Sequence, residues 1–167
     1  FEYINIENLF KNSNRIKNNK LQMRLKRFGD VLLSILLLIF TFPFLILSAI
    51  LIWLSDQGPI LYKQRRVGKD GKQFNLYKLR TMIINAEKNG AQWSNISDQR
   101  ITKIGKILRK LRIDELPQLL LVISGEMSLI GPRPERPKID ILLREHLPNY
   151  DLRYSIKPGI TGWAQVN

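Results

Sequence analysis

The sequence contains no cysteine, which excludes disulfide bonds and thiolate metal sites. It has one histidine, His146, and a lone histidine in a polar stretch is more often a surface or capping residue than a catalyst. The phosphate-binding patterns G-x-x-x-x-G-K-[ST] and G-x-G-x-x-G do not occur, and neither do H-E-x-x-H or G-x-S-x-G. These absences leave carboxylates and cations as the groups that can carry chemistry.

Negative charge is scarce, with 14 Asp and Glu against 27 Lys and Arg and a net charge of +13. This excess predicts an anionic partner, which can be nucleic acid, anionic lipid or a phosphorylated small molecule. The 167 residues suffice for one domain, or one domain plus an appendage. Because the sequence starts at Phe1 and stops without an evident terminal element, we expect it to be part of a longer chain, truncated at its C-terminus.

Charge is absent altogether from residues 31–54, a run long enough to cross a bilayer. A buried core helix is the less favoured interpretation, because core segments this long and this apolar are rare. Pro43 lies near the middle of the run and is expected to bend the helix. Cations flank both ends, and positive charge prefers the cytoplasmic side. We therefore predict a re-entrant membrane helix over residues 28–55, with a kinked spanning helix as the alternative.

The rest of the sequence has the pattern of a small, mostly helical α+β domain. Residues 59–82 predict a β-hairpin around an Asp70-Gly71 turn. Residues 97–113 open with the cap candidates Ser97 and Asp98 and predict a basic amphipathic helix, lying either on an anionic membrane surface or against the core. Three further segments are expected: an apolar helix or core segment over 116–123, a helix within 136–150 and a turn-rich loop over 156–165.

The adjacent carboxylates Asp114 and Glu115 follow the most basic run of the chain. Such a pair can bind Mg²⁺, and a carboxylate can act as a covalent nucleophile on phosphorus. Transfer of a phosphoryl group also needs cations around it. The candidates are Lys78, Arg80, Arg109 and Arg133. Spacing alone leaves open an acidic patch that pairs with neighbouring arginines.

Four strings together resemble one family, the bacterial sugar transferases or monotopic phosphoglycosyl transferases. They are GPILYKQRRVG, FNLYKLRTM, DQRITKIGKILRKLRIDELPQLLLVISGEMSLIGPRPE and KPGITGWAQVN, and they occur in the family's order. The resemblance implies a membrane enzyme that moves a sugar-1-phosphate from a UDP-sugar to polyprenyl (undecaprenyl) phosphate. Such a reaction initiates exopolysaccharide, capsule, O-antigen or glycoprotein glycan synthesis.

The resemblance also implies roles for single residues. Asp114 matches the family's nucleophile, and Glu115 matches its partner at a Mg²⁺ site. Arg109 and Arg133 match phosphate-binding positions, and Lys78 and Arg80 fall in a basic string of the family. Members often break the membrane helix with Ser-Pro, whereas this sequence has Phe42-Pro43, so that Pro43 keeps the bend and the hydroxyl has to come from Thr41.

Composition and charge divide the chain into a basic lead-in or linker (1–27), the re-entrant helix (28–55) and a soluble domain (56–167). The resemblance implies that this last domain is catalytic and lies on the cytoplasmic face of the bacterial inner membrane. The rival interpretation is a membrane-anchored, non-catalytic basic module that binds nucleic acid or organises glycan assembly. We expect no nucleic-acid partner, because the aromatic residues are not interleaved with the cations. The sequence leaves open the sugar and the oligomeric state, a homodimer included.

Overall fold

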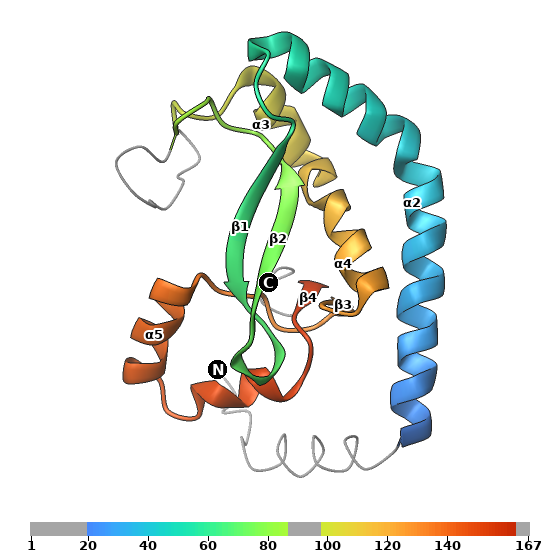
Figure 1. Cartoon of the computed structure of the whole chain (residues 1–167), viewed down its shortest axis with the longest axis vertical. Helices are drawn as coiled ribbons and strands as arrows, with labels where there is room; N and C mark the ends of the chain where they lie inside the picture. Colours follow the sequence, from blue (N-terminus) through green and yellow to red (C-terminus); the bar gives the residue numbers. More distant parts are fainter. Residues whose placement is uncertain (1–19, 87–97, 163–167) are drawn as a thin grey trace, which may run out of the picture.

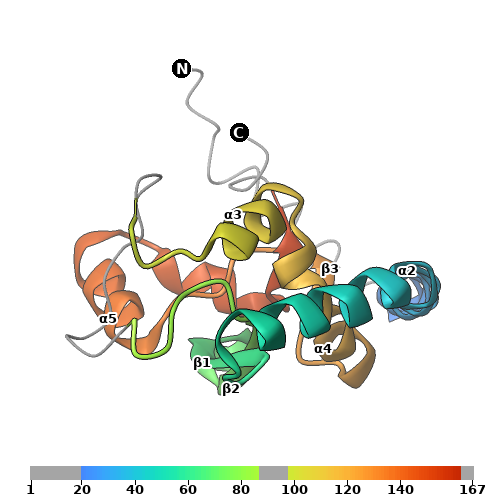
Figure 2. The ribbon, with the colours of Figure 1, turned by 90° about the horizontal axis from the view of Figure 1, so that it is seen from above.

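The uncharged run forms one continuous helix of 37 residues, α2 (Lys20–Asp56). The computed structural model describes residues 20–86 and 98–162, and α2 is the one helix in these ranges that is long and apolar enough to cross a membrane. Most of its large apolar side chains are exposed, Phe40 to 83%. Exposed apolar surface on this scale is typical of a segment that contacts lipid. Figures 1 and 2 both show α2 along one side of the molecule, opposite α5 (Pro137–His146).

The predicted bend is present, because Figure 1 shows that α2 changes direction about halfway along its length. Pro43 lies inside the helix and has no N–H to donate to the carbonyl of Ile39. The Thr41 hydroxyl donates to the carbonyl of Leu37 at 2.7 Å. Threonine hydroxyls that bond one turn back also bend helices. Thr41 and Pro43 thus both contribute to the bend. The Thr41 hydroxyl bonds to the Leu37 carbonyl, however, and not to the Ile39 carbonyl that Pro43 leaves without a donor.

The β-hairpin is confirmed. Strand β1 (Leu61–Val67) pairs antiparallel with β2 (Gln73–Leu79), with Gln64 opposite Leu76. The connecting turn contains the short 3₁₀ helix η1 (Lys69–Gly71), where Asp70 and Gly71 have φ angles of 56° and 71°. Positive φ at both positions is what an Asp-Gly hairpin turn provides.

The basic helix α3 (Lys103–Lys110) is shorter than the sequence predicts. The expectation that Ser97 and Asp98 cap it is wrong for Asp98, because Asp98 accepts hydrogen bonds from Arg100 in a local turn. Ser97 lies outside the described residues. Thr102 is the actual cap, since its hydroxyl accepts from the backbone N–H of Gly105 at 2.9 Å.

The apolar residues of α3 face in two directions. Leu108 is buried and Ile104 packs against the core, whereas Ile107 and Leu111 are both 59% exposed. The helix therefore contacts the core with one stripe and presents a second apolar stripe, flanked by lysines and arginines, at the surface.

The segment after α3 consists of a second 3₁₀ helix, η2 (Ile113–Gln118), and the apolar helix α4 (Leu119–Ser124). The predicted apolar segment over 116–123 is thus split at Pro117 between η2 and α4. Arg27 on α2 donates to the carbonyls of Val122 and Ile123. Because the last carbonyls of a helix lack partners within it, Arg27 both caps α4 and fastens α2 to it.

The C-terminal part contains α5, the 3₁₀ helix η3 (Tyr150–Ser155) and two three-residue strands, β3 (Ser128–Ile130) and β4 (Gly159–Thr161). The strands pair in parallel, with Ser128 opposite Gly159. The expected loop over 156–165 is therefore wrong at β4. A Cβ on Gly159 would lie 2.1 Å from the backbone nitrogen of Gly131, so close approach of two backbones explains a glycine that suggested a turn.

Two buried clusters hold these elements together. One joins β2, α4 and the segment before β3 through Leu76, Leu121, Val122 and Met127. The other joins the C-terminal half of α2 to β2 and α3 through Ile52, Leu79 and Leu108. The 3₁₀ helix η2 contacts β2, α3, α4 and α2. The carboxylate pair on η2 is therefore positioned by contacts from β2 and from three helices.

Candidate functional site

Asp114 and Glu115 lie in the first turn of η2, directly after the chain turns back from α3. Arg112 makes this turn with a left-handed backbone, φ 58°, which is uncommon for a residue other than glycine. Asp114 is buried, with 5% of its surface exposed, and the Glu115 side chain is 14% exposed. The only two adjacent carboxylates of the sequence thus lie in a site that excludes most water.

Three of the four predicted cations surround this pair. Arg133 donates to Glu115 at 3.2 Å, measured from Nη2 to Oε1. Arg109, in the last turn of α3, is held by a hydrogen bond of 2.8 Å from its Nε to the hydroxyl of Thr81. Lys78, on β2, lies with its Nζ 5.7 Å from the centre of the Tyr62 ring. Lys78 and Arg109 also act on Asp114 through their charges, so cations from β2, from α3 and from the loop after β3 lie around one carboxylate pair.

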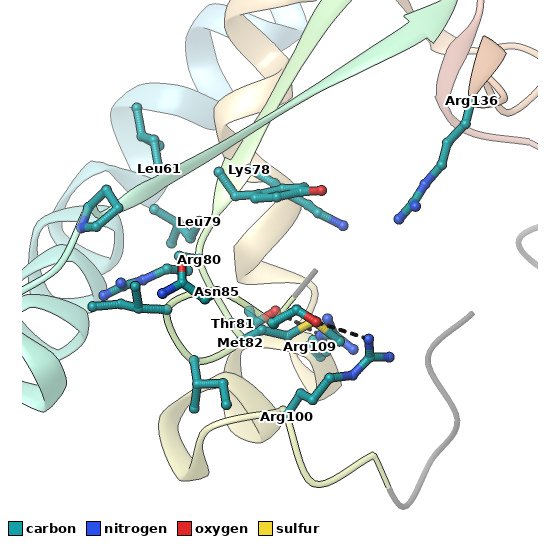
Figure 3. A pocket seen from close by; sticks show the side chains of 15 residues that line it. Leu61, Lys78, Leu79, Arg80, Thr81, Met82, Asn85, Arg100, Arg109 and Arg136 are labelled. Atoms are coloured by element: carbon teal, nitrogen blue, oxygen red, sulfur yellow. Dashed lines mark hydrogen bonds between the residues drawn. The ribbon is translucent and has the colours of Figure 1, made fainter. Parts of the chain in front are cut away.

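Arg80, the fourth predicted cation, makes its ion pair elsewhere. It is 8% exposed and donates to Asp56 at the end of α2. Figure 3 shows its side chain directed away from those of Lys78 and Arg109. This placement ties the C-terminal end of α2 to the segment that follows β2. A role for Arg80 in binding substrate stays a prediction.

Burial dominates the electrostatics of the site. It raises the pKa of Asp114, and the adjacent negative charge of Glu115 raises it further, while Lys78 and Arg109 act in the opposite direction. Burial also lowers the pKa of Lys78, against the attraction of Asp114. Because the cations do not fully offset the cost of ionising Asp114, the site favours additional positive charge.

The two carboxylates fit a magnesium site that substrate phosphates complete better than a site made by protein ligands alone. In residues 20–86 and 98–162, no group of three or more His, Cys, Asp or Glu residues could hold a metal ion by itself. Mg²⁺, however, is often bound by one or two carboxylates together with substrate phosphates. Asp114 and Glu115, with a raised pKa on Asp114, match that donor set.

A network behind Arg133 contains functional candidates that the sequence did not reveal. The buried carboxylate of Asp140 accepts hydrogen bonds from the hydroxyls of Tyr150, at 3.3 Å, and Tyr154, at 2.5 Å. Arg153 donates to the Tyr150 hydroxyl and to the backbone carbonyl of Arg133, and its guanidinium lies 4.6 Å from the centre of the Tyr150 ring. Arg153 therefore fixes the backbone that carries Arg133.

An open cleft of about 480 Å³ borders the site. It lies between the start of β1, the end of β2 and α3, and its lining includes Lys78, Arg109, Arg136 and Arg100. Figure 3 shows these four side chains directed toward a common space. A smaller hollow on the other side of Lys78 is lined by Glu115 and Arg133. Lys78 is thus shared by two neighbouring hollows.

The chain matches the family model described as bacterial sugar transferase over residues 21–167, so it belongs to that family. A UDP-N-acetylgalactosamine-undecaprenyl-phosphate N-acetylgalactosaminephosphotransferase from Aeromonas hydrophila is 47% identical over 143 residues, covering 85% of this chain and 34% of that protein. A UDP-glucose:undecaprenyl-phosphate glucose-1-phosphate transferase from Escherichia coli (strain K12) is 40% identical, covering 86% and 31%. An uncharacterized sugar transferase from Bacillus subtilis (strain 168) is 43% identical, covering 87% and 69%. The chain thus spans about a third of the first two relatives.

The raised pKa of Asp114 gives a prediction for stability. Between the unfolded pKa of 3.8 and the higher folded pKa, the folded chain binds more protons than the unfolded chain, so stability falls as pH rises. Asp114→Asn removes this loss. Without Mg²⁺, the variant should therefore unfold at a higher temperature than the wild type, with a gap that widens from pH 4 to pH 7 in thermal denaturation.

Asp140→Asn is the matched control for that experiment. Asp140 is also a buried carboxylate, and its two oxygens each accept a hydrogen bond from a tyrosine hydroxyl. An asparagine has only one acceptor oxygen, so one of the two hydroxyls would lose its partner. Asp140→Asn should therefore lower the unfolding temperature. The interpretation of Asp114 is wrong if Asp114→Asn also unfolds at or below the wild-type temperature at every pH.

The network behind Arg133 gives a second prediction. Arg153→Lys should raise the KM for the nucleotide sugar by about tenfold or more. A lysine cannot donate to the Tyr150 hydroxyl and the Arg133 carbonyl at once, so the Arg133 side chain would no longer be held in position. Arg144→Lys is the control, since Arg144 lies over Tyr154 but pairs with the exposed Asp151. Arg133→Met should add little in the Arg153→Lys background. Independent, additive effects of the two substitutions on KM would contradict this role.

Proposed function

We propose that this chain carries the catalytic part of an enzyme that transfers a sugar-1-phosphate from a UDP-sugar to undecaprenyl phosphate. The single observation that supports this most is a buried carboxylate, Asp114, with cations from separate elements around it. The relatives' names specify this class of reaction but different sugars. We therefore propose the class of donor and not a particular sugar.

The proposed reaction has two steps through Asp114. In the first, a carboxylate oxygen attacks the β-phosphorus of the UDP-sugar, and the bond from that phosphorus to the bridging oxygen breaks. UMP leaves, and the sugar phosphate remains on Asp114 as an acyl phosphate. In the second, an oxygen of undecaprenyl phosphate attacks the same phosphorus, and the bond to Asp114 breaks. The carboxylate is thereby regenerated.

The surrounding residues act on the charge that moves in these steps. Arg109, Arg133 and Lys78 would neutralise phosphate oxygens, and their fixed positions avoid reorganisation during the reaction. The low-dielectric surroundings of Asp114 remove the water that would otherwise hydrolyse an acyl phosphate. When bound, Mg²⁺ held by Asp114 and Glu115 would withdraw charge from the diphosphate.

The covalent step is tested by mass spectrometry. Wild-type protein incubated with Mg²⁺ and a panel of UDP-sugars, without acceptor, should gain the mass of one phosphosugar and release an equal amount of UMP. Asp114→Asn should do neither. Glu115→Gln should form the adduct more slowly and require more Mg²⁺. An adduct on a residue other than Asp114, or turnover by Asp114→Asn, would contradict the proposed route.

The proposed topology places both ends of α2 on the cytoplasmic side of the bacterial inner membrane. It is supported by the bend at Pro43, by the cations on both flanks of the apolar run and by the cytoplasmic supply of nucleotide sugars. Bent helices are tolerated in lipid where the freed backbone groups find other partners. A re-entrant α2 would hold Asp114 at the membrane surface.

Cysteine accessibility tests this topology in a chain without native cysteine. Single cysteines at Gln22 and Gln57 should both be protected from membrane-impermeant reagents in intact cells. Labelling of one of them from outside would show that α2 spans the bilayer. Pro43→Leu should straighten the helix and shift the protein toward that spanning form.

A further inference from the structure

The cleft, which shares Lys78 and Arg109 with the surroundings of Asp114, has two chemically different walls. One wall is cationic and includes Lys78 from β2, Arg109 from α3 and Arg136 at the start of α5. Arg100 also lines the cleft but is bound to Asp98 through two nitrogens. The other wall is apolar, and its residues Leu61, Ile83 and Ile84 are 51%, 49% and 47% exposed. Figure 3 shows the side chain of Leu61 on the side of the cleft opposite Arg136 and Arg100.

The apolar wall lies next to the end of the membrane helix. It begins with Pro59, three residues after α2 ends at Asp56. Trp53 and Leu54, in the last turns of α2, are themselves 50% and 63% exposed. Exposed apolar side chains therefore occur both at the end of α2 and on the cleft wall, and Ile84 lies close to Gly58 in the segment that connects them.

The cationic wall lies next to the reactive carboxylate. Lys78 and Arg109 are the two cations whose charges lower the pKa of Asp114. An anionic group bound between Lys78, Arg109 and Arg136 would consequently lie beside the group that receives or releases the sugar phosphate. The cleft thus has an apolar wall near the end of α2 and a cationic wall that can bind an anionic group.

We infer that this cleft binds the acceptor substrate, a long-chain isoprenoid phosphate, with its phosphate at Lys78, Arg109 and Arg136 and its first isoprene units along Leu61, Ile83 and Ile84. This assignment rests on the proposed function. A nucleotide fits the apolar wall poorly, because uracil and ribose need hydrogen-bonding partners that leucine and isoleucine side chains lack.

The bound acceptor is positioned for the second step. One of its phosphate oxygens forms a bond to the phosphorus carried by Asp114, and the bond from that phosphorus to the carboxylate oxygen breaks. The electron pair of the broken bond returns to Asp114. An acceptor phosphate that is a dianion needs no proton transfer, and the cations offset the repulsion between the two negative phosphates.

Ile83→Glu tests the inference, because the two half-reactions separate the substrates. The full chain in nanodiscs should form the phosphosugar adduct from UDP-sugar at the wild-type rate. Its KM for undecaprenyl phosphate should rise by about tenfold or more, since a carboxylate would face the apolar chain and oppose the incoming phosphate. Ile141→Glu is the matched control, because Ile141 is 56% exposed on α5, on the side of the molecule opposite α2.

The outcomes are distinguishable. Slower adduct formation in Ile83→Glu would assign the cleft to the donor, and equal effects of Ile83→Glu and Ile141→Glu on the acceptor KM would assign it to neither substrate. Both results overturn the inference. If even the wild type forms no adduct, the proposed reaction fails, and binding alone then tests the cleft.

That binding test uses three probes: geranylgeranyl phosphate, geranylgeraniol and inorganic phosphate. Geranylgeranyl phosphate should raise the unfolding temperature of the wild type more than the other two probes do. The increase should disappear in both Ile83→Glu and Arg136→Gln but persist in Ile141→Glu. Equal stabilisation of wild type and Ile83→Glu by this probe would overturn the inference.

Discussion

The burial of the Asp114 carboxylate is the constraint on which the rest of the candidate site depends. Ionising a carboxyl group away from water is unfavourable, so its pKa is raised unless opposite charge is held close to it. Lys78 and Arg109 supply part of that charge and are themselves held by Tyr62 and Thr81. Because this positive charge does not fully offset the cost of ionising Asp114, the site favours binding of further cations. Asp114 also stays available to react, since no tight ion pair within the described residues holds it.

The fold supplies the rigidity that such a site needs. Two buried apolar clusters lie along β2, one reaching α4 and the other reaching α2 and α3. Asp114 lies on the short 3₁₀ helix between α3 and α4, so its position follows from packing on both sides. Arg27 fastens α2 to the end of α4, and Arg80 fastens its other end to the segment that follows β2 through Asp56. The apolar helix α2 and the carboxylate pair are thus held in fixed positions relative to one another.

Local patterns predicted most of the fold. The uncharged run and Pro43 predicted a bent apolar helix, and Asp70-Gly71 predicted the hairpin turn, because each depends on residues that are adjacent in the chain. The start of α3 at Thr102 was missed, since Asp98 forms a competing turn with Arg100. The parallel pairing of β3 with β4 was also missed, because it joins segments about 30 residues apart and its glycine resembles a turn signal.

The candidate site was predictable to a similar degree. The strings around Asp114, Glu115, Arg109 and Arg133 identified residues that the structure brings together. The pairing of Arg80 with Asp56, and the chain of contacts from Asp140 through Tyr150 and Arg153 to Arg133, have no sequence signature. They arise from tertiary contacts between side chains whose spacing follows no helical or strand period.

The pKa of the Asp114 carboxyl is the measurement that tests the account most directly. It can be followed by NMR in protein labelled with ¹³C at aspartate side chains, with the signal assigned by its absence in Asp114→Asn. We expect a pKa above 3.8 in the absence of substrate and metal, and a decrease when Mg²⁺ and a nucleotide are added. A pKa at or below 3.8 in the free protein would contradict it.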